Sequence, residues 1–294
     1  MGAVYLAKDT RLDRQVAIKR LNLVASQQDL DLFKKRFERE AKVMASFQHP
    51  NIVSVFDYGQ DDAGVYLVLE YVPGGSLAQE MRKRRFTVEE AIEILLPLSE
   101  ALSAIHSRNR VHRDIKPANV IFDEYGNPKL ADFGVVKLLE RQDGHTLTAT
   151  GAAVGTPAYM APELIGGEAS PATDQYALGV VLYELVTGKK PFKGRTPMET
   201  LTMQKYEPLP DPRILEPELP IWLCRIIKAA LAKDPHKRYP NIRMFANALR
   251  AGAPKKHGSA PASPAYSENK TEPVPPTVAH KPRVVPTGVV QPNR

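Results

Sequence analysis

Residues 112–119 read His-Arg-Asp-Ile-Lys-Pro-Ala-Asn, and an Asp-Phe-Gly triplet follows at 132–134. The first motif comes after a long predicted helix, and both are expected on loops between short strands. Carboxylates and an amide brought together on such loops can bind hard divalent cations through oxygen, and a further carboxylate can orient a hydroxyl group. Either motif alone is weak evidence. Both in this order, followed by Ala-Pro-Glu at 161–163, form a highly specific pattern.

Short alternating apolar segments precede these motifs. Strands are expected at 4–7, 15–21, 52–58 and 65–71, with hairpin turns at 13–14 and 61–64. One helix is expected at 29–46. After residue 76 the pattern becomes mostly helical, with helices at 88–107 and at 173–187, the latter apolar nearly all round and therefore central in its lobe. This order predicts an α+β fold, with a small antiparallel β lobe that carries one helix and a larger, mainly helical lobe.

Glu40 lies at the edge of the apolar stripe of the first helix, three residues after Phe37 and four before Met44. A carboxylate at such a position is costly unless it is paired. Lys19, at the end of the run Val-Ala-Ile-Lys, is the candidate partner if its side chain points into a cleft. On these residues alone, a lysine on the solvated surface is the alternative.

The composition is that of an ordinary globular protein, with 43% apolar and 25% charged residues among 294. The apolar stretches are too short and too interrupted to cross a bilayer, and Met1 does not begin a signal-peptide pattern, so a cytoplasmic location is expected. The single cysteine, Cys224, cannot form an internal disulfide and is expected to pack within a helix.

The last 43 residues, 252–294, differ in composition from the rest. They hold nine prolines, and their six Lys or Arg against two Glu account for +4 of the net charge of +7. The +3 that remains on the folded part is not typical of a nucleic-acid-binding protein. We expect this segment to be a disordered, Pro-rich linker or tail, and a docking motif for a proline-binding module is the alternative.

From Met1 to about Arg250 the motifs resemble the eukaryotic-like (Hanks-type) serine/threonine protein kinases, in the style of the bacterial members. The resemblance implies a two-lobed fold that holds ATP and Mg²⁺, or Mn²⁺ in its place, in the cleft between the lobes. The lobes would span residues 1–72 and 73–251, ahead of the tail at 252–294.

The resemblance assigns the residues of the chemistry. Lys19 would hold the α- and β-phosphates and be positioned by Glu40. Asp114 would accept or orient the proton of the substrate hydroxyl, and Lys116 would neutralise charge near the γ-phosphate.

The same resemblance assigns the nucleotide contacts. Asn119 and Asp132 would coordinate Mg²⁺. The adenine contacts would be the hinge backbone from Glu70 to Val72, Leu69 behind it, and Val4 and Ala17 over one face of the ring.

Three further residues have implied structural roles. Asp174 would brace the catalytic loop from the central helix. Glu163 would pair with Arg238 in a structural salt bridge, so both are excluded from the chemistry.

Two features indicate the phosphate acceptor. Lys116, two residues after Asp114, and Thr156 in the Gly-Thr-Pro at 155–157 match the pattern of serine/threonine kinases. Dual specificity is the alternative. A small-molecule kinase is disfavoured because Gly-Thr-Pro and Ala-Pro-Glu together form a shelf that receives a peptide.

Regulation can be argued from charge. Arg113 places a cation beside Asp114 and would disorder its surroundings until an anion arrives, which a phosphothreonine can supply. By resemblance, Thr148 and Thr150 are the expected autophosphorylation sites, in trans within a kinase dimer, and Thr156 contacts the catalytic loop. The alternative is that these threonines are solvated loop residues.

The beginning of the sequence departs from the family pattern. Kinases cover the phosphates with a Gly-x-Gly-x-x-Gly-x-Val hairpin, and residues 1–4, Met-Gly-Ala-Val, match only its end, so that Gly2 corresponds to the third glycine. Without the first strand the next one has an unpaired edge. We expect a truncated gene model or a fragment, with a reading frame that continues upstream, and a natural short form is the alternative. Bacterial relatives commonly continue from such a tail into a membrane span, so the full-length protein could be membrane-anchored.

The competing function is an inactive or weakly active pseudokinase that acts as a binding scaffold. A scaffold has no chemical need for the five polar residues Lys19, Glu40, Asp114, Asn119 and Asp132 together.

Overall fold

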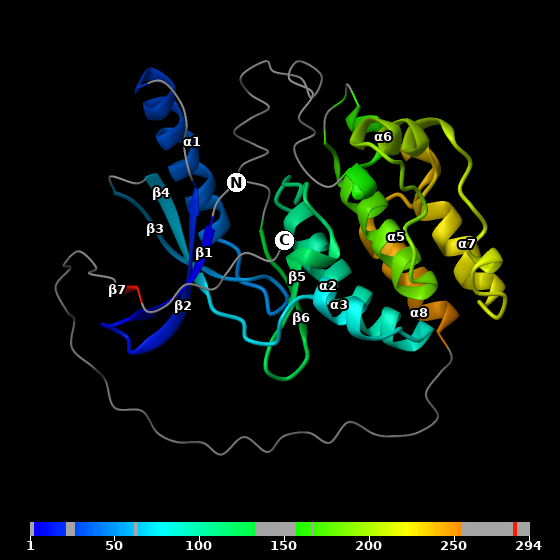
Figure 1. The fold of residues 1–294 in the computed structure, drawn as a ribbon, viewed down its shortest axis with the longest axis horizontal. Helices are drawn as coiled ribbons and strands as arrows, with labels where there is room; N and C mark the ends of the chain where they lie inside the picture. The colour runs from blue at the N-terminus through cyan, green and yellow to red at the C-terminus, as the bar shows by residue number, and fades with distance from the viewer. Residues whose placement is uncertain are drawn as a thin grey trace.

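The computed structural model of the chain describes residues 3–21, 27–61, 64–132, 157–165, 167, 169–253 and 285–286. These residues form a small β lobe and a larger helical lobe (Figure 1). The predicted α+β architecture, with an antiparallel sheet and one helix followed by a mainly helical lobe, is confirmed.

The small lobe is one antiparallel sheet with the strand order β3-β4-β2-β1-β7. Its strands are β1 (Ala3–Asp9), β2 (Arg14–Leu21), β3 (Val55–Asp61), β4 (Gly64–Glu70) and β7 (Val285–Pro286). Lys19 of β2 lies opposite Val4 of β1 and Leu67 of β4, so these three side chains share one face of the sheet. Helix α1 (Gln27–Ala45) packs Phe37 and Met44 against that face, in one buried cluster with Leu67.

The β3–β4 hairpin turns where the sequence predicts a turn, with Asp61 opposite Gly64. Gly64 has a φ of +126°, and a Cβ atom there would lie 2.8 Å from the carbonyl oxygen of Leu21. The turn therefore requires glycine, which has no Cβ and adopts positive φ readily.

The start of β3 differs from the prediction. A strand was expected from Ile52, but β3 begins at Val55. Ile52 forms an isolated parallel bridge with Leu130 of the other lobe, and the N–H of Val53 donates to the Leu130 carbonyl at 2.9 Å. The apolar pair at 52–53 joins the two lobes instead of extending the sheet, a difference that the local apolar pattern does not reveal.

The outer edge of β1 is partly covered, although an unpaired edge was expected. Val285 lies opposite Lys8, and Pro286 lies opposite Ala7, in antiparallel register. Proline is tolerated at the end of a sheet because it lacks only an N–H that can face solvent there. This pairing lies within the Pro-rich segment and was not predicted from the sequence.

The larger lobe is built around α5 (Pro171–Thr187), of which 14 of 17 residues are buried, as its apolar pattern predicts. The surrounding elements are α2 (Leu77–Lys83), α3 (Val88–His106), α6 (Pro197–Tyr206), α7 (Ile221–Ala230), α8 (Ile242–Gly252) and the hairpin of β5 (Val120–Phe122) and β6 (Pro128–Leu130). Within the described ranges, no helix combines the length and apolarity needed to span a bilayer.

Candidate active site

The loop between α3 and β5 organises a network around Asp114. The Asn119 side-chain amide donates to the Asp114 backbone carbonyl and to its carboxylate Oδ2, both at 2.8 Å. Lys116 Nζ donates to the same Oδ2 at 2.8 Å. Asn119 is held in turn by the short 3₁₀ turn Pro117–Asn119, where its side chain is buried. Three of the predicted site residues therefore meet at one carboxylate oxygen.

Asp174 anchors this loop to the core of the larger lobe. Its carboxylate, on α5 and only 1% exposed, accepts the backbone N–H groups of His112 at 2.8 Å and Arg113 at 2.9 Å. His106 Nε2 lies 2.9 Å from the same carboxylate. A buried carboxylate is tolerated when donors surround it in this way. The predicted bracing role of Asp174 is confirmed, whereas the contribution of His106 was missed because no motif marks it.

His112 connects the loop to the β5–β6 hairpin. Its Nε2 lies 3.1 Å from the Ala131 carbonyl, and its Nδ1 lies 3.4 Å from the backbone N–H of Asp114. Burial lowers the pKa of His112, so the ring is neutral, with Nε2 donating and Nδ1 accepting. This link fixes the loop next to Asp132, the residue that follows Ala131.

Asp132 meets Lys19 across the two lobes. The distance between Lys19 Nζ and Asp132 Oδ1 is 2.5 Å, and the two side chains are 19% and 34% exposed. Asp132 has a φ of +60°, and Arg113 has a φ of +70°. Non-glycine residues seldom adopt this region, and such strain concentrates at functional sites. The structure thus brings Lys19, from β2, to the loop that carries the second predicted metal ligand.

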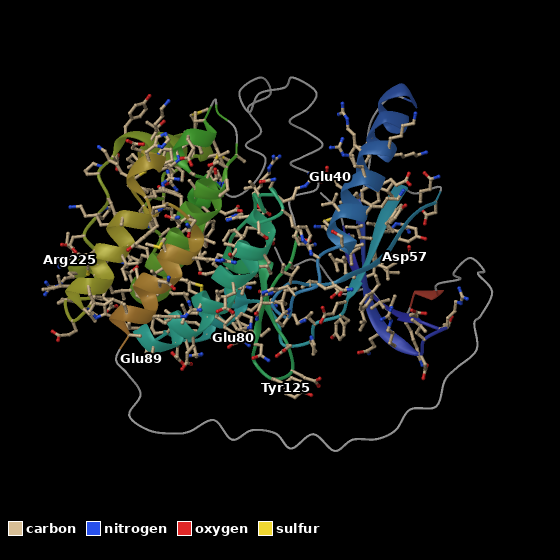
Figure 2. All side chains as sticks on the ribbon, turned by 180° about the vertical axis from the view of Figure 1, so that it is seen from behind. Glu40, Asp57, Glu80, Glu89, Tyr125 and Arg225 are labelled. Carbon is tan, nitrogen blue, oxygen red and sulfur yellow. The ribbon has the colours of Figure 1, made fainter. Side chains whose placement is uncertain are left out.

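The expected pair of Lys19 with Glu40 is not the pair that the structure contains. Glu40 Oε2 lies 3.6 Å from a guanidinium nitrogen of Arg110, while Lys19 pairs with Asp132. Glu40 lies on α1, on the side towards the helical lobe (Figure 2). The predicted Lys19–Glu40 pair is therefore wrong for this structure: each of the two side chains has an oppositely charged partner, but Lys19 contacts Asp132 and Glu40 contacts Arg110. The sequence motifs do not determine which cation pairs with which carboxylate, because that depends on the distances between these side chains in the folded chain.

The hinge segment is tied to both lobes through Glu70. One oxygen of its carboxylate lies 2.7 Å from Lys129 Nζ on β6, and the other accepts the backbone N–H of Ser54 at 3.1 Å. The sequence predicted only adenine binding by the hinge backbone and gave no indication that Lys129 pairs with the Glu70 side chain. Of the adenine contacts predicted beside the hinge, Ala17 lies opposite Leu69 in the sheet. Val4 on β1 is 47% exposed, and Val72, two residues after the end of β4, is partly buried.

A salt bridge attaches the segment after residue 156 to the larger lobe. Arg238, whose side chain is 0% exposed, donates to both carboxylate oxygens of Glu163 at 2.7 Å. This two-point contact has the geometry of a strong arginine–carboxylate pair, and it confirms the predicted structural salt bridge. Four predicted positions, Gly2, Thr148, Thr150 and Thr156, lie outside the described residues.

The oxygen atoms of the site fit Mg²⁺. The side-chain nitrogen of Asn119 donates to Asp114, so its side-chain carbonyl oxygen could face a cation, and Asp132 offers a carboxylate of which Oδ1 contacts Lys19. The described residues contain no group of three or more His, Cys, Asp or Glu able to hold a metal ion. Two protein ligands suit Mg²⁺, which is usually bound by one or two side chains together with water and phosphate oxygens.

This combination of fold and site defines a protein kinase domain. The sequence matches the protein kinase domain family over residues 1–248, and the chain belongs to that family.

Its relatives include bacterial enzymes. The chain is 39% identical over 241 residues to the serine/threonine-protein kinase PrkC of Bacillus subtilis, an alignment that covers 81% of this chain and 36% of PrkC. It is 39% identical over 258 residues to the serine/threonine-protein kinase PknA of Mycobacterium tuberculosis, covering 85% of this chain and 58% of PknA. The probable serine/threonine-protein kinase PknB of Lactococcus lactis is 37% identical over 245 residues, with coverages of 82% and 38%. The chain therefore spans less than two thirds of the length of each of these relatives.

Proposed function

We propose that the chain transfers the γ-phosphoryl group of ATP to serine or threonine hydroxyls of proteins. The observation that carries the proposal is the meeting of Lys116 and Asn119 on one oxygen of Asp114, in a loop that also adjoins the Lys19–Asp132 pair. The choice of serine or threonine rests on the sequence pattern at Lys116 and on the similarity to the serine/threonine-protein kinases PrkC and PknA.

In this function Asp114 orients the acceptor hydroxyl and receives its proton, and Lys116 offsets the charge that develops nearby. Lys19, Asn119 and Asp132 bind the phosphates and Mg²⁺; when bound, the cation neutralises phosphate charge. The adenine and phosphate contacts are assigned, as in the sequence analysis, to Gly2, Val4, Ala17, Leu69, Glu70 and Val72.

Glu40 has a positioning role in this proposal. To hold Lys19 in place it must exchange its contact with Arg110 for one with Lys19. The Arg110–Glu40 contact is long at 3.6 Å and partly exposed, so giving it up costs little; Lys19 must also leave Asp132, which Mg²⁺ binding to Asp132 would favour.

The proposal extends to regulation and organisation. Thr148 and Thr150 are assigned as autophosphorylation sites, in trans within a dimer, and Thr156 as a contact to the catalytic loop. The lobe boundaries are placed after residue 72 and after residue 251, and the kinase domain is placed in the cytoplasm.

The test is transfer of ³²P from γ-labelled ATP to protein, with identification of the labelled amino acid. Replacing Asp114 with Asn keeps the size of the side chain and removes the base, which should lower the rate by about 100-fold or more. The matched control is Asp57→Asn, an exposed aspartate on β3 that should leave the rate unchanged (Figure 2). Equal rates for the parent and Asp114→Asn would refute the proposal, as would label found only on tyrosine.

A further inference from the structure

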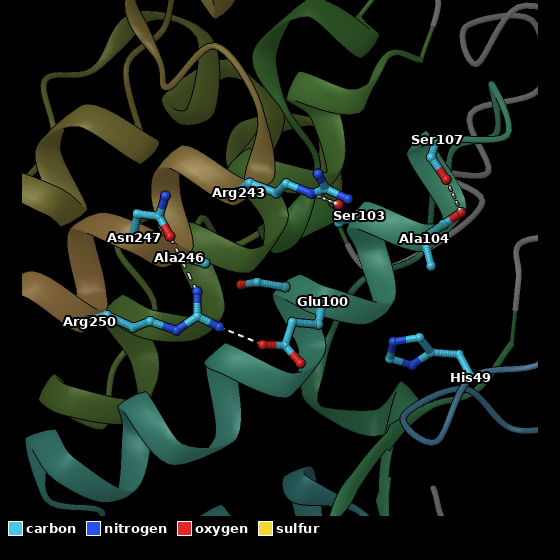
Figure 3. A pocket seen from close by; sticks show the side chains of 10 residues that line it. His49, Glu100, Ser103, Ala104, Ser107, Arg243, Ala246, Asn247 and Arg250 are labelled. Atoms are coloured by element: carbon cyan, nitrogen blue, oxygen red, sulfur yellow. Dashed lines mark hydrogen bonds and ion pairs between the residues drawn. The ribbon is translucent and has the colours of Figure 1, made fainter.

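A hollow of about 490 Å³ lies between α3 and α8 (Figure 3). Its lining comes from one face of each helix and from the loop after α1, and the residues are His49, Ser99, Glu100, Ser103, Ala104, Ser107, Arg243, Ala246, Asn247 and Arg250. None of these residues takes part in the proposed phosphoryl transfer. The volume lies within the range of small-molecule sites.

The hollow exists because both helices present short side chains where they face each other. Ser99, Ser103 and Ala104 line it from α3, and Ala246 lines it from α8. The hydroxyl of Ser99 donates to the Leu95 carbonyl at 2.8 Å, so it does not need a hydrogen bond from a ligand. The inner wall therefore suits the organic part of a ligand.

Two arginines of α8 lie above this wall. Arg243, Asn247 and Arg250 are spaced four and three residues apart and so share a helix face. Arg250 is engaged by Glu100 at 2.5 Å and by Asn247 at 3.3 Å. The two guanidinium groups and one carboxylate leave a net positive charge at the hollow.

Arg243 is held differently. Arg243 is exposed, and its Nε donates to Ser103 Oγ at 2.8 Å, which orients the guanidinium group. Its two terminal nitrogens have no partner among the residues that the structure describes, so an oriented pair of donors is available to an anion. This fork matches two oxygens of a phosphate or carboxylate.

His49 supplies a further donor from the opposite side. The backbone N–H of Asn51 donates to His49 Nδ1 at 3.1 Å, so the neutral ring carries its proton on Nε2. Figure 3 shows the ring across the hollow from α8. A planar carboxylate has two oxygens, whereas a phosphoryl group has three that point in different directions and can serve both Arg243 and donors on the other side.

We propose that this hollow binds a small phosphate monoester, with Arg243 as the anchoring charge and the short side chains of α3 and α8 around the organic part. The site lies outside the nucleotide cleft and is independent of the proposed kinase activity. The site differs from a surface that attracts anions in general, because Arg243 is oriented by Ser103 with its terminal nitrogens available, whereas Arg250 is already paired with Glu100.

The test is an NMR titration of the whole chain with glycerol 3-phosphate, followed at the arginine Nε–H and histidine ring signals. The readout is local to Arg243 and His49, so glycerol 3-phosphate that binds in the nucleotide cleft does not produce the expected shifts. Saturable shifts of Arg243 and His49 are expected. Arg243→Gln should weaken binding by about tenfold or more, since a charged hydrogen-bonding partner is lost. Glu100→Gln should strengthen binding by about threefold, since a repelling carboxylate is removed and Arg250 is released.

The control variant is Arg225→Gln, which removes the same charge from an exposed position on α7 (Figure 2). Its affinity should equal that of the parent. An equal loss in Arg225→Gln and Arg243→Gln would show that the attraction is only a general charge effect and would overturn the proposal. So would the absence of a saturable shift, or inorganic phosphate binding as tightly as glycerol 3-phosphate, because the organic part would then have no site.

Discussion

Asp174 gives the most informative single substitution for the integrity of the site. Replacing it with Asn preserves its shape but removes the negative charge and turns one acceptor oxygen into an NH₂ group. That group would then face the backbone N–H of His112 or Arg113, both of which now donate to the carboxylate. Losing one hydrogen bond to a charged acceptor in a position that is 1% exposed costs about 3 kcal/mol. For a domain of this size the loss corresponds to a decrease in Tm of about 6–12 °C.

The same substitution should lower kcat/KM by about 100-fold, because the loop that carries Asp114 is no longer held at its present position. Calorimetry and steady-state kinase assays measure the two effects. Asp57→Asn, exposed on β3, provides the control and should change neither value. The reasoning is refuted if Asp174→Asn melts with the parent chain, or if its stability falls while kcat/KM is retained.

Three other substitutions test separate interactions. Arg238→Met leaves the Glu163 carboxylate without its bidentate partner and should lower the free energy of unfolding, measured in urea, by about 3–5 kcal/mol. Adding Glu163→Gln should recover part of that loss. A double variant no more stable than Arg238→Met would argue against the stabilising role of the pair. Arg110→Gln releases Glu40 from a partly exposed pair worth about 1 kcal/mol. The rate of phosphoryl transfer should rise by up to about fivefold, because Glu40 becomes available to Lys19. A lower rate would show that Arg110 does not compete with Lys19 for Glu40. Burial raises the pKa of Glu184, so the folded chain keeps its proton at pH values where the unfolded chain has lost it. The free energy of unfolding should therefore fall as the pH rises through that interval, and Glu184→Gln should flatten the slope; parallel pH profiles would contradict this.

Much of the fold follows from patterns within short segments. The buried helix α5 is recognisable because it is apolar on every side, and the β3–β4 turn because Gly64 is required there. Asp174 and the Glu163–Arg238 pair could be placed by resemblance, since each belongs to a motif or follows one at a familiar spacing. These features are local or are fixed by the family pattern, so the sequence is sufficient for them.

The remaining features depend on distances between segments far apart in the sequence. Arg110 and Lys129 carry no motif, and only the packed structure shows that they reach Glu40 and Glu70. The apolar residues at 52–53 would suit a strand equally well. Their use at the junction with Leu130 depends on where the β5–β6 hairpin lies. Which of several possible partners a side chain contacts is determined by the tertiary structure, and no local sequence pattern indicates it.

Calorimetric titration with ADP tests most directly whether Lys19, Asn119 and Asp132 form one magnesium–nucleotide site beside Asp114. One binding event per chain is expected. Asp132→Asn should weaken it by about tenfold in Mg²⁺ but little in its absence, because a metal ligand is lost. Lys19→Met should weaken it in both conditions, since the lysine acts on the phosphates themselves. Identical affinities of the parent and Asp132→Asn in Mg²⁺ would contradict the assignment of this cleft as the nucleotide site.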